Sequence, residues 1–407
     1  MNILMVNQPL NNRGDEAAHK ALLRALVKEM PEVKVNVLFI DKNEDSIRQF
    51  NVNLPNVEYT NIHIARGYSR IYYWFLGHNN SKLPFMIHPT YRKVWSFYEW
   101  ADVVLCAPGG ICMGGFQVWL HLFFLKIAKL AKKPLAYYGR SIGPFPTETE
   151  ENRRFKKLSV EMMNYFSYFS LRDKKSEKLA SEMGFKYVST VDSAFLDAPR
   201  VEIPKEISTE IGSNPYIVFV PNLLVWHFTY NQHKEEDSLK FFAKVTEEIK
   251  RAYPNHKYVM LPQLFNSPNK DYQDVLFFRK LVEYTGNKNM VVVSDKYSSD
   301  IQQTIIAGSD LVVGARYHSV VFALNNNIPC VALSYESKIS GLLQTLGKED
   351  YLCDITHVLD TEEEMDKTCE RIRYILNNRP AVLKTKQDAE SYASKGFDTF
   401  VKYLKEL

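Results

Sequence analysis

The chain has 407 residues, with 51 Lys and Arg against 47 Asp and Glu, and 45% of its residues are hydrophobic. This composition is near the globular average and excludes a disordered, collagen-like or disulfide-stapled protein. The net charge of +4 is small for this length, so nucleic acid is not an expected partner. Five cysteines without a C-x-x-C pair predict reduced thiols in a cytoplasmic protein.

No segment of the sequence predicts export or membrane insertion. The first ten residues, MNILMVNQPL, have no basic leader and no small-residue cleavage site, so we expect no signal peptide. The most apolar stretch, residues 118–125, is followed by Lys126 and Lys129. It is shorter than the roughly 20 apolar residues that span a bilayer, so it predicts a buried amphipathic helix.

Apolar runs of strand length alternate with helix-period segments along almost the whole chain. Continuous Val, Ile, Leu and Phe runs are typical of strands buried on both faces of a parallel sheet. Helices are expected between them, among others at 16–30, 117–132, 150–166, 239–253 and 272–284. The strands are expected at 3–7, 33–40, 103–107, 135–138, 168–171 and 187–190, and then at 216–221, 258–262, 291–294, 311–314 and 330–334.

These two strand–helix series predict an α/β protein with two doubly wound, mostly parallel, Rossmann-like sheets. The length also favours two domains. A Pro-rich stretch without periodicity separates the series. We assign residues 1–197 to an N-terminal domain, 198–212 to a linker, 213–360 to a C-terminal domain, and 361–407 to helices that pack back on the first domain.

Residues 66–100 interrupt the alternation with eleven aromatic residues and five Lys or Arg against a single Glu. A helical insertion whose aromatic side chains face the core is the favoured interpretation. A cationic, aromatic surface for sugar rings or for the inner face of an anionic membrane is the alternative.

Common cofactor signatures are missing from the sequence. It has no G-x-x-x-x-G-K-[ST], no G-x-G-x-x-G and no H-E-x-x-H, and its ten His residues lack metal-ligand spacing. We therefore predict no metal and no cofactor, and we look for the site among polar loops that follow the strands.

Two such loops lie early in the chain. In the first, Gly14 permits a tight turn and Asp15 is a good helix N-cap, although its carboxylate could also accept a proton from a substrate hydroxyl. In the second, Gly109 and Gly110 follow a buried strand. Backbone N–H groups of such a loop can approach a ligand oxygen, or the loop can be a plain strand–helix connection.

Two further loops contain arginines. Arg140 and Ser141 follow the apolar run at 135–138, where Arg140 would either point at an anion or be solvated. Arg172 and Asp173 follow the run at 168–171, where they could form an internal ion pair and Ser176 could cap the next helix.

The most informative loop follows residues 311–314, where Arg316, His318 and Ser319 begin a helix. N–H groups and the dipole at a helix start favour an anion, and Arg offers a planar fork for carboxylate or phosphate. His can donate to the same anion or move a proton near neutral pH. Tyr335 and Lys338 follow the next strand, so the sequence predicts a phosphate or carboxylate pocket in the second domain.

Together these motifs resemble the polysaccharide pyruvyl transferase family, in order and over most of the chain. The resemblance departs from the family where the glycine turn reads Gly-Gly-Ile and where the aromatic block is inserted. The residues that carry it are Asn12, Gly14 and Asp15; Asp102, Gly109 and Gly110; Gly139, Ser141, Ile142, Gly143 and Pro144; Arg172, Asp173 and Ser176; Val191 and Asp192; Gly314, Arg316 and His318; Pro329; and Tyr335 and Lys338.

The resemblance implies a fold similar to the GT-B glycosyltransferases, with the active site in the cleft between the domains. It implies transfer of a carboxyethylidene group from phosphoenolpyruvate to two hydroxyls of one sugar, giving a cyclic ketal and phosphate. No metal is implied. By position, Arg316 and His318 match the family's donor-binding and catalytic pair. Arg172 matches a second arginine of the family, and Asp15 matches the family's acidic residue near the N-terminus.

The residues fit this chemistry. We expect His318 to protonate the methylene carbon of the donor, Arg316 to hold its phosphate and carboxylate with Arg172 and Lys338, and Asp15 to act as base for the sugar hydroxyl. The other residues expected to bind substrate are Asn12, Gly109, Gly110, Arg140, Ser141, Ser319 and Tyr335.

Two other functions stay open. One is a glycosyltransferase that uses a nucleotide sugar, because fold does not determine function. It would need the same cations, with Glu336 as its carboxylate. A non-catalytic subunit that binds a glycan or a lipid carrier would use the aromatic and basic block. The sequence does not distinguish a free sugar acceptor from a lipid-linked one, and it does not predict the oligomeric state.

Overall fold

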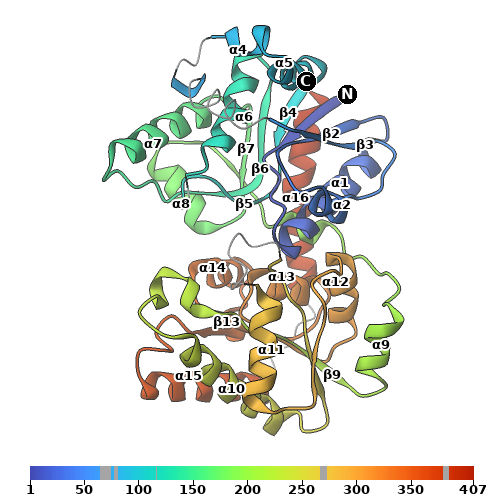
Figure 1. Cartoon of the computed structure of the whole chain (residues 1–407), viewed down its shortest axis with the longest axis vertical. Coiled ribbons are helices and arrows are strands. Elements are labelled where there is room, and N and C mark those ends of the chain that lie inside the picture. Colours follow the sequence, from blue (N-terminus) through green and yellow to red (C-terminus); the bar gives the residue numbers. More distant parts are fainter. Residues whose placement is uncertain (65–74, 78–80, 116, 266–272, 379–384) are drawn as a thin grey trace. The chain divides into compact units, whose positions relative to one another are not determined.

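The computed structural model describes residues 1–64, 75–77, 81–115, 117–265, 273–378 and 385–407, and the chain divides into two compact units (Figure 1). The first comprises Met1–Leu10, Ala18–Asp197 and Tyr392–Leu407, and the second comprises Asn11–Ala17 and Ala198–Ser391. The short segment Asn11–Ala17 therefore belongs to the second unit, although it lies close to the start of the sequence.

The first unit is built on a parallel sheet in the order β3-β2-β1-β4-β6-β7-β8, with β5 paired to β6. Leu4 in β1 lies opposite Asn36 in β2 and Val104 in β4. The central strands are buried on both faces, as their continuous apolar runs predict. The strands are β1 (Asn2–Val6), β2 (Lys34–Ile40), β3 (Val57–Ile62), β4 (Val103–Cys106), β5 (Gly109–Met113), β6 (Leu135–Ile142), β7 (Tyr168–Leu171) and β8 (Val188–Ser189).

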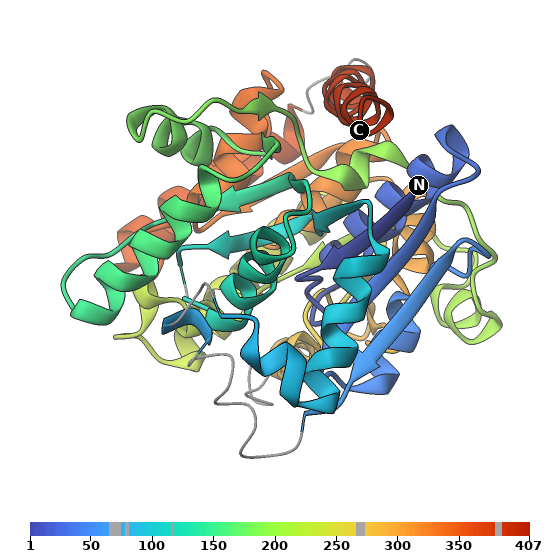
Figure 2. The same ribbon diagram turned by 90° about the horizontal axis from the view of Figure 1, so that it is seen from above.

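Helices cover both faces of this sheet. Leu4, Val104 and Tyr137 belong to a core that includes side chains of α5, α6 and α7. On the other face, Tyr138 and Tyr168 contact Phe400 of α16, which lies on the opposite side of the sheet from α5 and α6 in Figure 2. The helices are α1 (Arg13–Glu29), α2 (Glu44–Phe50), α4 (Leu83–Ile87), α5 (Pro89–Trp100), α6 (Trp119–Leu130), α7 (Glu150–Met163), α8 (Lys174–Glu182), η1 (Ser193–Leu196) and α16 (Thr385–Lys405).

The second unit has a parallel sheet in the order β11-β10-β9-β12-β13-β14. Phe219 in β9 contacts Phe242 of α10, which in turn contacts Phe277 of α11, so these two helices cover one face. Its strands are β9 (Tyr216–Val220), β10 (Lys257–Met260), β11 (Met290–Val292), β12 (Val312–Gly314), β13 (Cys330–Ser334) and β14 (Leu352–Asp354). Its helices are α9 (Lys205–Ile211), η2 (Leu224–Trp226), η3 (Phe228–Tyr230), α10 (Glu235–Ala252), α11 (Asp274–Thr285), α12 (Ser299–Ala307), α13 (Tyr317–Asn325), α14 (Ser337–Thr345), η5 (Glu349–Tyr351) and α15 (Glu362–Asn377).

The predicted fold class, two mostly parallel α/β sheets, is confirmed. Three strands were not predicted, for physical reasons. β3 (VEYTNI) and β14 (LCD) lie at or near sheet edges, where one or both faces are partly exposed and a continuous apolar run is not needed. β5 begins with two glycines, which are rare in strands, so the sequence suggested a turn.

The structure also locates the segments assigned to the linker, the tail and the aromatic block. Residues 198–212 contain α9 and lie in the second unit. In the tail, of which 379–384 lie outside the described residues, α15 belongs to the second unit and most of α16 to the first. Residues 66–74 of the aromatic block lie outside the described residues. Tyr272, the first residue of the helix expected at 272–284, lies outside them as well. Among those described, Phe75, Phe85, Tyr91 and Tyr98 are buried, as the favoured interpretation expects.

The cysteines are free, as expected, because none forms a disulfide. All five are buried: Cys106, Cys112, Cys330, Cys353 and Cys369.

Candidate active site

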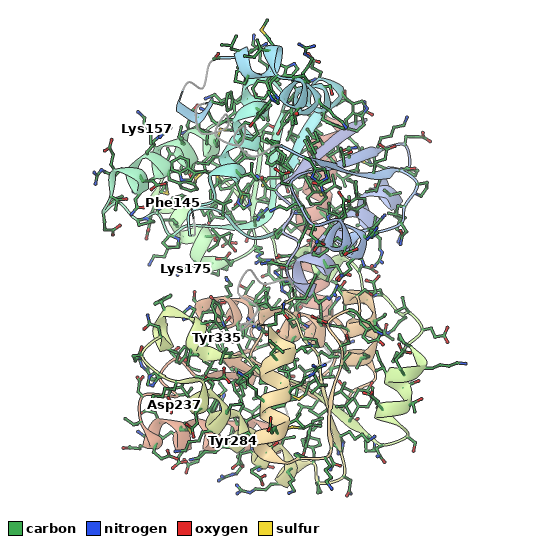
Figure 3. The ribbon with its side chains drawn as sticks, in the orientation of Figure 1. Phe145, Lys157, Lys175, Asp237, Tyr284 and Tyr335 are labelled. Atoms are coloured by element: carbon green, nitrogen blue, oxygen red, sulfur yellow. The ribbon has the colours of Figure 1, made fainter. Side chains whose placement is uncertain are left out.

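The carboxyl ends of four neighbouring strands of the second sheet each carry a polar or aromatic residue. Gln263 follows β10, Asn222 follows β9, Arg316 follows β12 and Tyr335 follows β13 (Tyr335 is labelled in Figure 3). Because the strands are parallel, these residues lie at one edge of the sheet, where open α/β sheets bind ligands.

Arg316 is held at this edge by Asp274, the first residue of α11. A terminal nitrogen of the Arg316 guanidinium donates to Oδ1 of Asp274. The other carboxylate oxygen, Oδ2, accepts from the backbone N–H groups of Gln263 at 2.9 Å and Leu264 at 2.8 Å. The carboxylate is therefore fixed from the loop after β10, and it orients the guanidinium.

The Arg316 side chain is 12% exposed. Within the described part of the chain, its Nε is buried and has no hydrogen-bond partner. A buried charged donor without an acceptor is costly, so this arrangement favours an anion beside the guanidinium.

Aromatic rings pack on one another beside the guanidinium. The ring of Trp226 lies 5.9 Å from the guanidinium carbon of Arg316, and Trp226 donates to Oδ1 of Asn222 at 3.0 Å. Tyr335 meets Trp226 edge-on at 6.1 Å and His227 at 5.4 Å. These contacts give the edge of the sheet a rigid, partly apolar wall beside a cation.

Burial and neighbouring charges shift the pKa values of three of these groups. Burial alone would lower the pKa of Arg316, but Asp274, Tyr335 and Glu336 outweigh it and raise that pKa. Burial, reinforced by Glu336, raises the pKa of Tyr335 well above its ordinary value. Burial also lowers the pKa of His227. The site therefore presents one permanent cation beside a neutral phenol at neutral pH.

His318 lies in the first turn of α13, two residues after Arg316. Its imidazole packs directly on Gly14, because a β-carbon built on Gly14 would lie 1.7 Å from Nδ1 of His318. Only a residue without a side chain fits at position 14 while the imidazole keeps this place. The structure therefore brings the predicted Gly14–Asp15 loop and the predicted His318 together within the second unit.

The loop before α1 is joined to the second sheet by backbone hydrogen bonds. Arg13 N donates to the carbonyl of Gln263 at 2.8 Å, and Phe265 N donates to the carbonyl of Asn11 at 3.0 Å. The side chain of Asn12 accepts from the backbone N–H of Asp15 at 2.7 Å and donates to the Asp15 carboxylate. The prediction that Asp15 is the N-cap is therefore wrong, because Asn12 caps α1 and leaves Asp15 in the first turn.

A buried ion pair anchors the same loop, and the sequence analysis did not identify it. Arg13 and Glu16 pair with both side chains 0% exposed, and Glu16 accepts from the backbone N–H of Ser299 at 3.1 Å. Arg13 also lies 3.9 Å from the centre of the Phe265 ring. The pair therefore holds the first turn of α1 in the second unit.

Two other predicted residues of the second unit have different surroundings. Ser319 is fully buried and donates to the carbonyl of Arg316 at 2.6 Å, so its hydroxyl closes the first turn of α13. The substrate-binding role of Ser319 stays a prediction. Lys338 is more accessible, at 37% exposed, and its Nζ lies 3.3 Å from Oε1 of Glu336.

In the first unit, Arg140 is part of the sheet. It is 1% exposed, and it donates to the carbonyl oxygens of Asn7 at 2.7 Å, Ala107 at 3.0 Å and Gly110 at 2.9 Å. The loop predicted after residue 138 is wrong, because Gly139 adopts a positive φ of 54° and β6 continues past it as a bulge. Arg140 is thus neither solvated nor in a loop.

The predicted glycine turn pairs with this strand. Gly109 lies opposite Arg140, and Ile111 lies opposite Ser141. Gly109 and Gly110 are therefore the start of strand β5, not a loop at a helix N-terminus. The hydrogen bond seen at this turn is internal: the backbone carbonyl of Gly110 accepts from Nε of Arg140.

Arg172 is also used inside the first unit. Its guanidinium pairs with the fully buried Asp192, not with the adjacent Asp173. Asp173 is the N-cap of α8, accepting from the backbone N–H of Ser176 at 2.8 Å, and Ser141 donates to it at 2.6 Å. Ser176 is thus not the cap, and the binding roles of Arg172 and Ser141 stay predictions.

The residues of the second-unit site that the sequence analysis did not identify include Asn222, Trp226, Gln263 and Asp274. Asn222 had a signal, since the Pro-Asn pair ends a buried strand as the other polar loops do. Asp274 had none, because only the tertiary structure brings the start of α11 to Arg316.

Across the described residues, no group of three or more His, Cys, Asp or Glu could hold a metal ion. None of the helices in the described ranges is long and apolar enough to cross a membrane.

Comparison with solved structures shows which fold the chain has. A UDP-GlcNAc 2-epimerase from Neisseria meningitidis, solved with UDP-GlcNAc, is 11% identical with a TM-score of 0.58 over 100% of both chains. A ugt transferase from Siraitia grosvenorii, solved with UDP, is 10% identical with a TM-score of 0.56 over 98% of this chain and 99% of that one. At such identities the likeness concerns the fold alone, which is similar to that of the GT-B glycosyltransferases.

The family is given by the sequence match. The family model "Polysaccharide pyruvyl transferase" matches residues 12–337, so the chain belongs to the polysaccharide pyruvyl transferase family, a family of transferases. The amylovoran biosynthesis protein AmsJ of Erwinia amylovora is 26% identical over 243 residues. That match covers 57% of this chain and 57% of AmsJ, so the chain spans little more than half the length of this relative. The family match begins at Asn12 and ends just beyond Tyr335.

Proposed function

We propose that this protein transfers a carboxyethylidene group from phosphoenolpyruvate to two hydroxyls of one sugar during the biosynthesis of a bacterial surface polysaccharide. Family membership supports the class of reaction, and the name of the relative AmsJ supports the pathway. The observation that carries the proposal is Arg316: a buried guanidinium, oriented by Asp274, with Nε unpartnered within the described part of the chain.

In the proposed reaction, Arg316 holds the anionic part of the donor by charge-assisted hydrogen bonds. Lys338, in the first turn of α14 after the neighbouring strand β13, adds a second cation for the phosphate. The phenol of Tyr335 keeps its proton at neutral pH because its pKa is raised, so it can donate a hydrogen bond without adding negative charge.

His318 is the proposed proton donor. Protonation of the methylene carbon of the enol phosphate creates a cation at the adjacent carbon, which a sugar hydroxyl attacks. Asp15 accepts the proton of that hydroxyl. The second hydroxyl of the sugar then displaces phosphate and closes the ketal, and its proton leaves with the phosphate as hydrogen phosphate. The proton on Asp15 replaces the one that His318 gave up, so one phosphate leaves for each ketal formed. His318 and the Gly14–Asp15 loop lie together in the second unit, which supports these roles.

The test is a thermal-shift comparison of phosphoenolpyruvate with a panel of nucleotide sugars. It uses wild type, Arg316→Ala and, as a control, Lys240→Ala, which removes an exposed cation of α10. A ligand at about 100 times its Kd stabilises a protein by about 2.7 kcal/mol, which raises Tm by several degrees.

We expect phosphoenolpyruvate to stabilise wild type and Lys240→Ala but not Arg316→Ala. Stabilisation by a nucleotide sugar alone would contradict the proposal and favour a glycosyltransferase. If neither donor stabilises the protein but glycans bind to it tightly, the result would favour a non-catalytic glycan-binding subunit.

A further inference from the structure

The short helix α4 of the first unit, which is labelled in Figure 1, exposes apolar side chains. Leu83, Met86 and Ile87 are 50%, 64% and 68% exposed. They are three of the five residues of this helix, and the other two, Pro84 and Phe85, are buried. Single exposed apolar residues are common on protein surfaces, but three on one helix form a patch that calls for a partner.

The helix is held rigidly in this orientation. The ring of Phe85 contacts the rings of Phe75, Tyr91, Trp95 and Phe123 at distances of 5.3 to 6.4 Å. This aromatic cluster fixes the inner face of α4 in the core, so the outer face is presented by a well-packed scaffold.

Three exposed cations, Lys82, Arg92 and Lys93, lie close to these apolar residues in the sequence. Arg92 donates to the backbone carbonyl of Met86, which places its guanidinium at the border of the patch. The Nζ of Lys82 lies 5.1 Å from the centre of the Trp95 ring. We call these three cations together with Leu83, Met86 and Ile87 the α4 patch.

The chain segment that carries the α4 patch has charges of one sign. Residues 81–98 contain three Lys or Arg and no Asp or Glu, a net charge of +3, whereas the whole chain has +4. Exposed apolar side chains next to exposed cations fit a surface that is apolar below and anionic above, which is the interface of an anionic bilayer.

We propose that the α4 patch docks this protein on anionic phospholipid membranes, with Leu83, Met86 and Ile87 inserted at the level of the headgroups. The cations then lie beside the lipid phosphates. The proposal rests on this surface and not on the proposed catalytic activity. It is tested without any donor or sugar, so the two proposals can fail separately.

The experiment is flotation of the full-length protein with vesicles of phosphatidylcholine alone or of phosphatidylcholine mixed with phosphatidylglycerol. The variants are Met86→Ser/Ile87→Ser, which removes the apolar contact, and Arg92→Gln/Lys93→Gln, which removes charge. Tyr374→Ser is the control, because Tyr374 is 58% exposed on α15, which belongs to the second unit. Thermal unfolding confirms that each variant is folded.

We expect wild type and Tyr374→Ser to float with the anionic vesicles, with less binding at high salt. We expect Met86→Ser/Ile87→Ser to bind the anionic vesicles at least about tenfold more weakly than wild type. The charge variant should lose binding to anionic vesicles in particular. No flotation of wild type, or equal flotation of Met86→Ser/Ile87→Ser, would overturn the proposal. So would self-association of wild type, in place of lipid binding, that this double variant abolishes, because a second copy of the chain would then cover the patch.

Discussion

The imidazole of His318 lies directly on Gly14, where a β-carbon would come within 1.7 Å of Nδ1. No positive φ constrains this glycine, so its small size matters more than its backbone freedom. The contact joins the loop before the first helix to the helix that follows β12, and it gives the predicted proton donor a defined position.

We expect Gly14→Ala to displace the His318 ring, because the backbone can accept alanine but the ring atoms occupy its space. Ketal formation should fall strongly, and overpacking should destabilise the protein by about 1–3 kcal/mol. Phosphate release with acceptor glycans and urea unfolding measure the two effects. Gly341→Ala is the matched control: it lies in helix α14, no atom would lie within 4 Å of its β-carbon, and alanine there should be neutral or slightly stabilising. Wild-type turnover in Gly14→Ala would contradict the assigned position of His318.

Replacing Asp15 separates a catalytic role from a structural one. Asn12 caps α1, and an asparagine at position 15 can still accept from the Asn12 amide, so we expect Asp15→Asn to change stability by less than about 1 kcal/mol. Loss of the base should lower turnover on the order of 100-fold. Phosphate release and Tm are measured together on the same preparation. A variant with reduced Tm and normal turnover would show that Asp15 is structural only.

Asp274→Asn removes the negative partner of a buried guanidinium. Because the positive charge of Arg316 would stay buried without compensation, we expect unfolding to become easier by about 3–5 kcal/mol. The comparison is Asp366→Asn, whose ion pair with Lys244 is exposed and should contribute about 0–1 kcal/mol. Urea unfolding of both variants decides: similar small losses would mean that the Asp274–Arg316 pair does not stabilise the site.

His19 predicts how stability depends on pH. It is fully buried on α1, with Nε2 2.8 Å from the Tyr59 hydroxyl, and burial together with Lys20 lowers its pKa from 6.5 to about 3. Between these values the unfolded chain binds a proton that the folded chain does not. The stabilising effect of the neutral ring is therefore complete above about pH 6.5 and is lost as the pH falls toward 3.

We expect His19→Gln to flatten this dependence by one proton, about 1.4 kcal/mol per pH unit, in urea unfolding at a series of pH values below 6.5. Burial lowers the pKa of His121 to about 3 as well, so adding His121→Gln should flatten it further. An unchanged slope in both variants would contradict the assignment of acid sensitivity to these rings.

Much of the fold was predictable because its signal is local. Runs such as Tyr168–Leu171 and Cys330–Ser334 are strands with the predicted bounds, since strands buried on both faces need continuous apolar sequence. β3 and β14 escaped because exposure at or near a sheet edge relaxes that need. The strand predicted at 135–138 was too short, because glycine often adopts a positive φ and ends a strand. Here Gly139 has a positive φ but forms a bulge within β6, which continues to Ile142.

The sequence by itself determined that two parallel sheets form, and that Arg316 and His318 stand where a strand gives way to a helix. Only the tertiary structure decided their partners: Asp274 for Arg316, Gly14 for His318, and Asp192 rather than the adjacent Asp173 for Arg172. The physical reason is that hydrophobic periodicity is set by neighbours along the chain. The pairing of charges depends on the order of the strands in the sheet, which brings together residues that no local pattern connects.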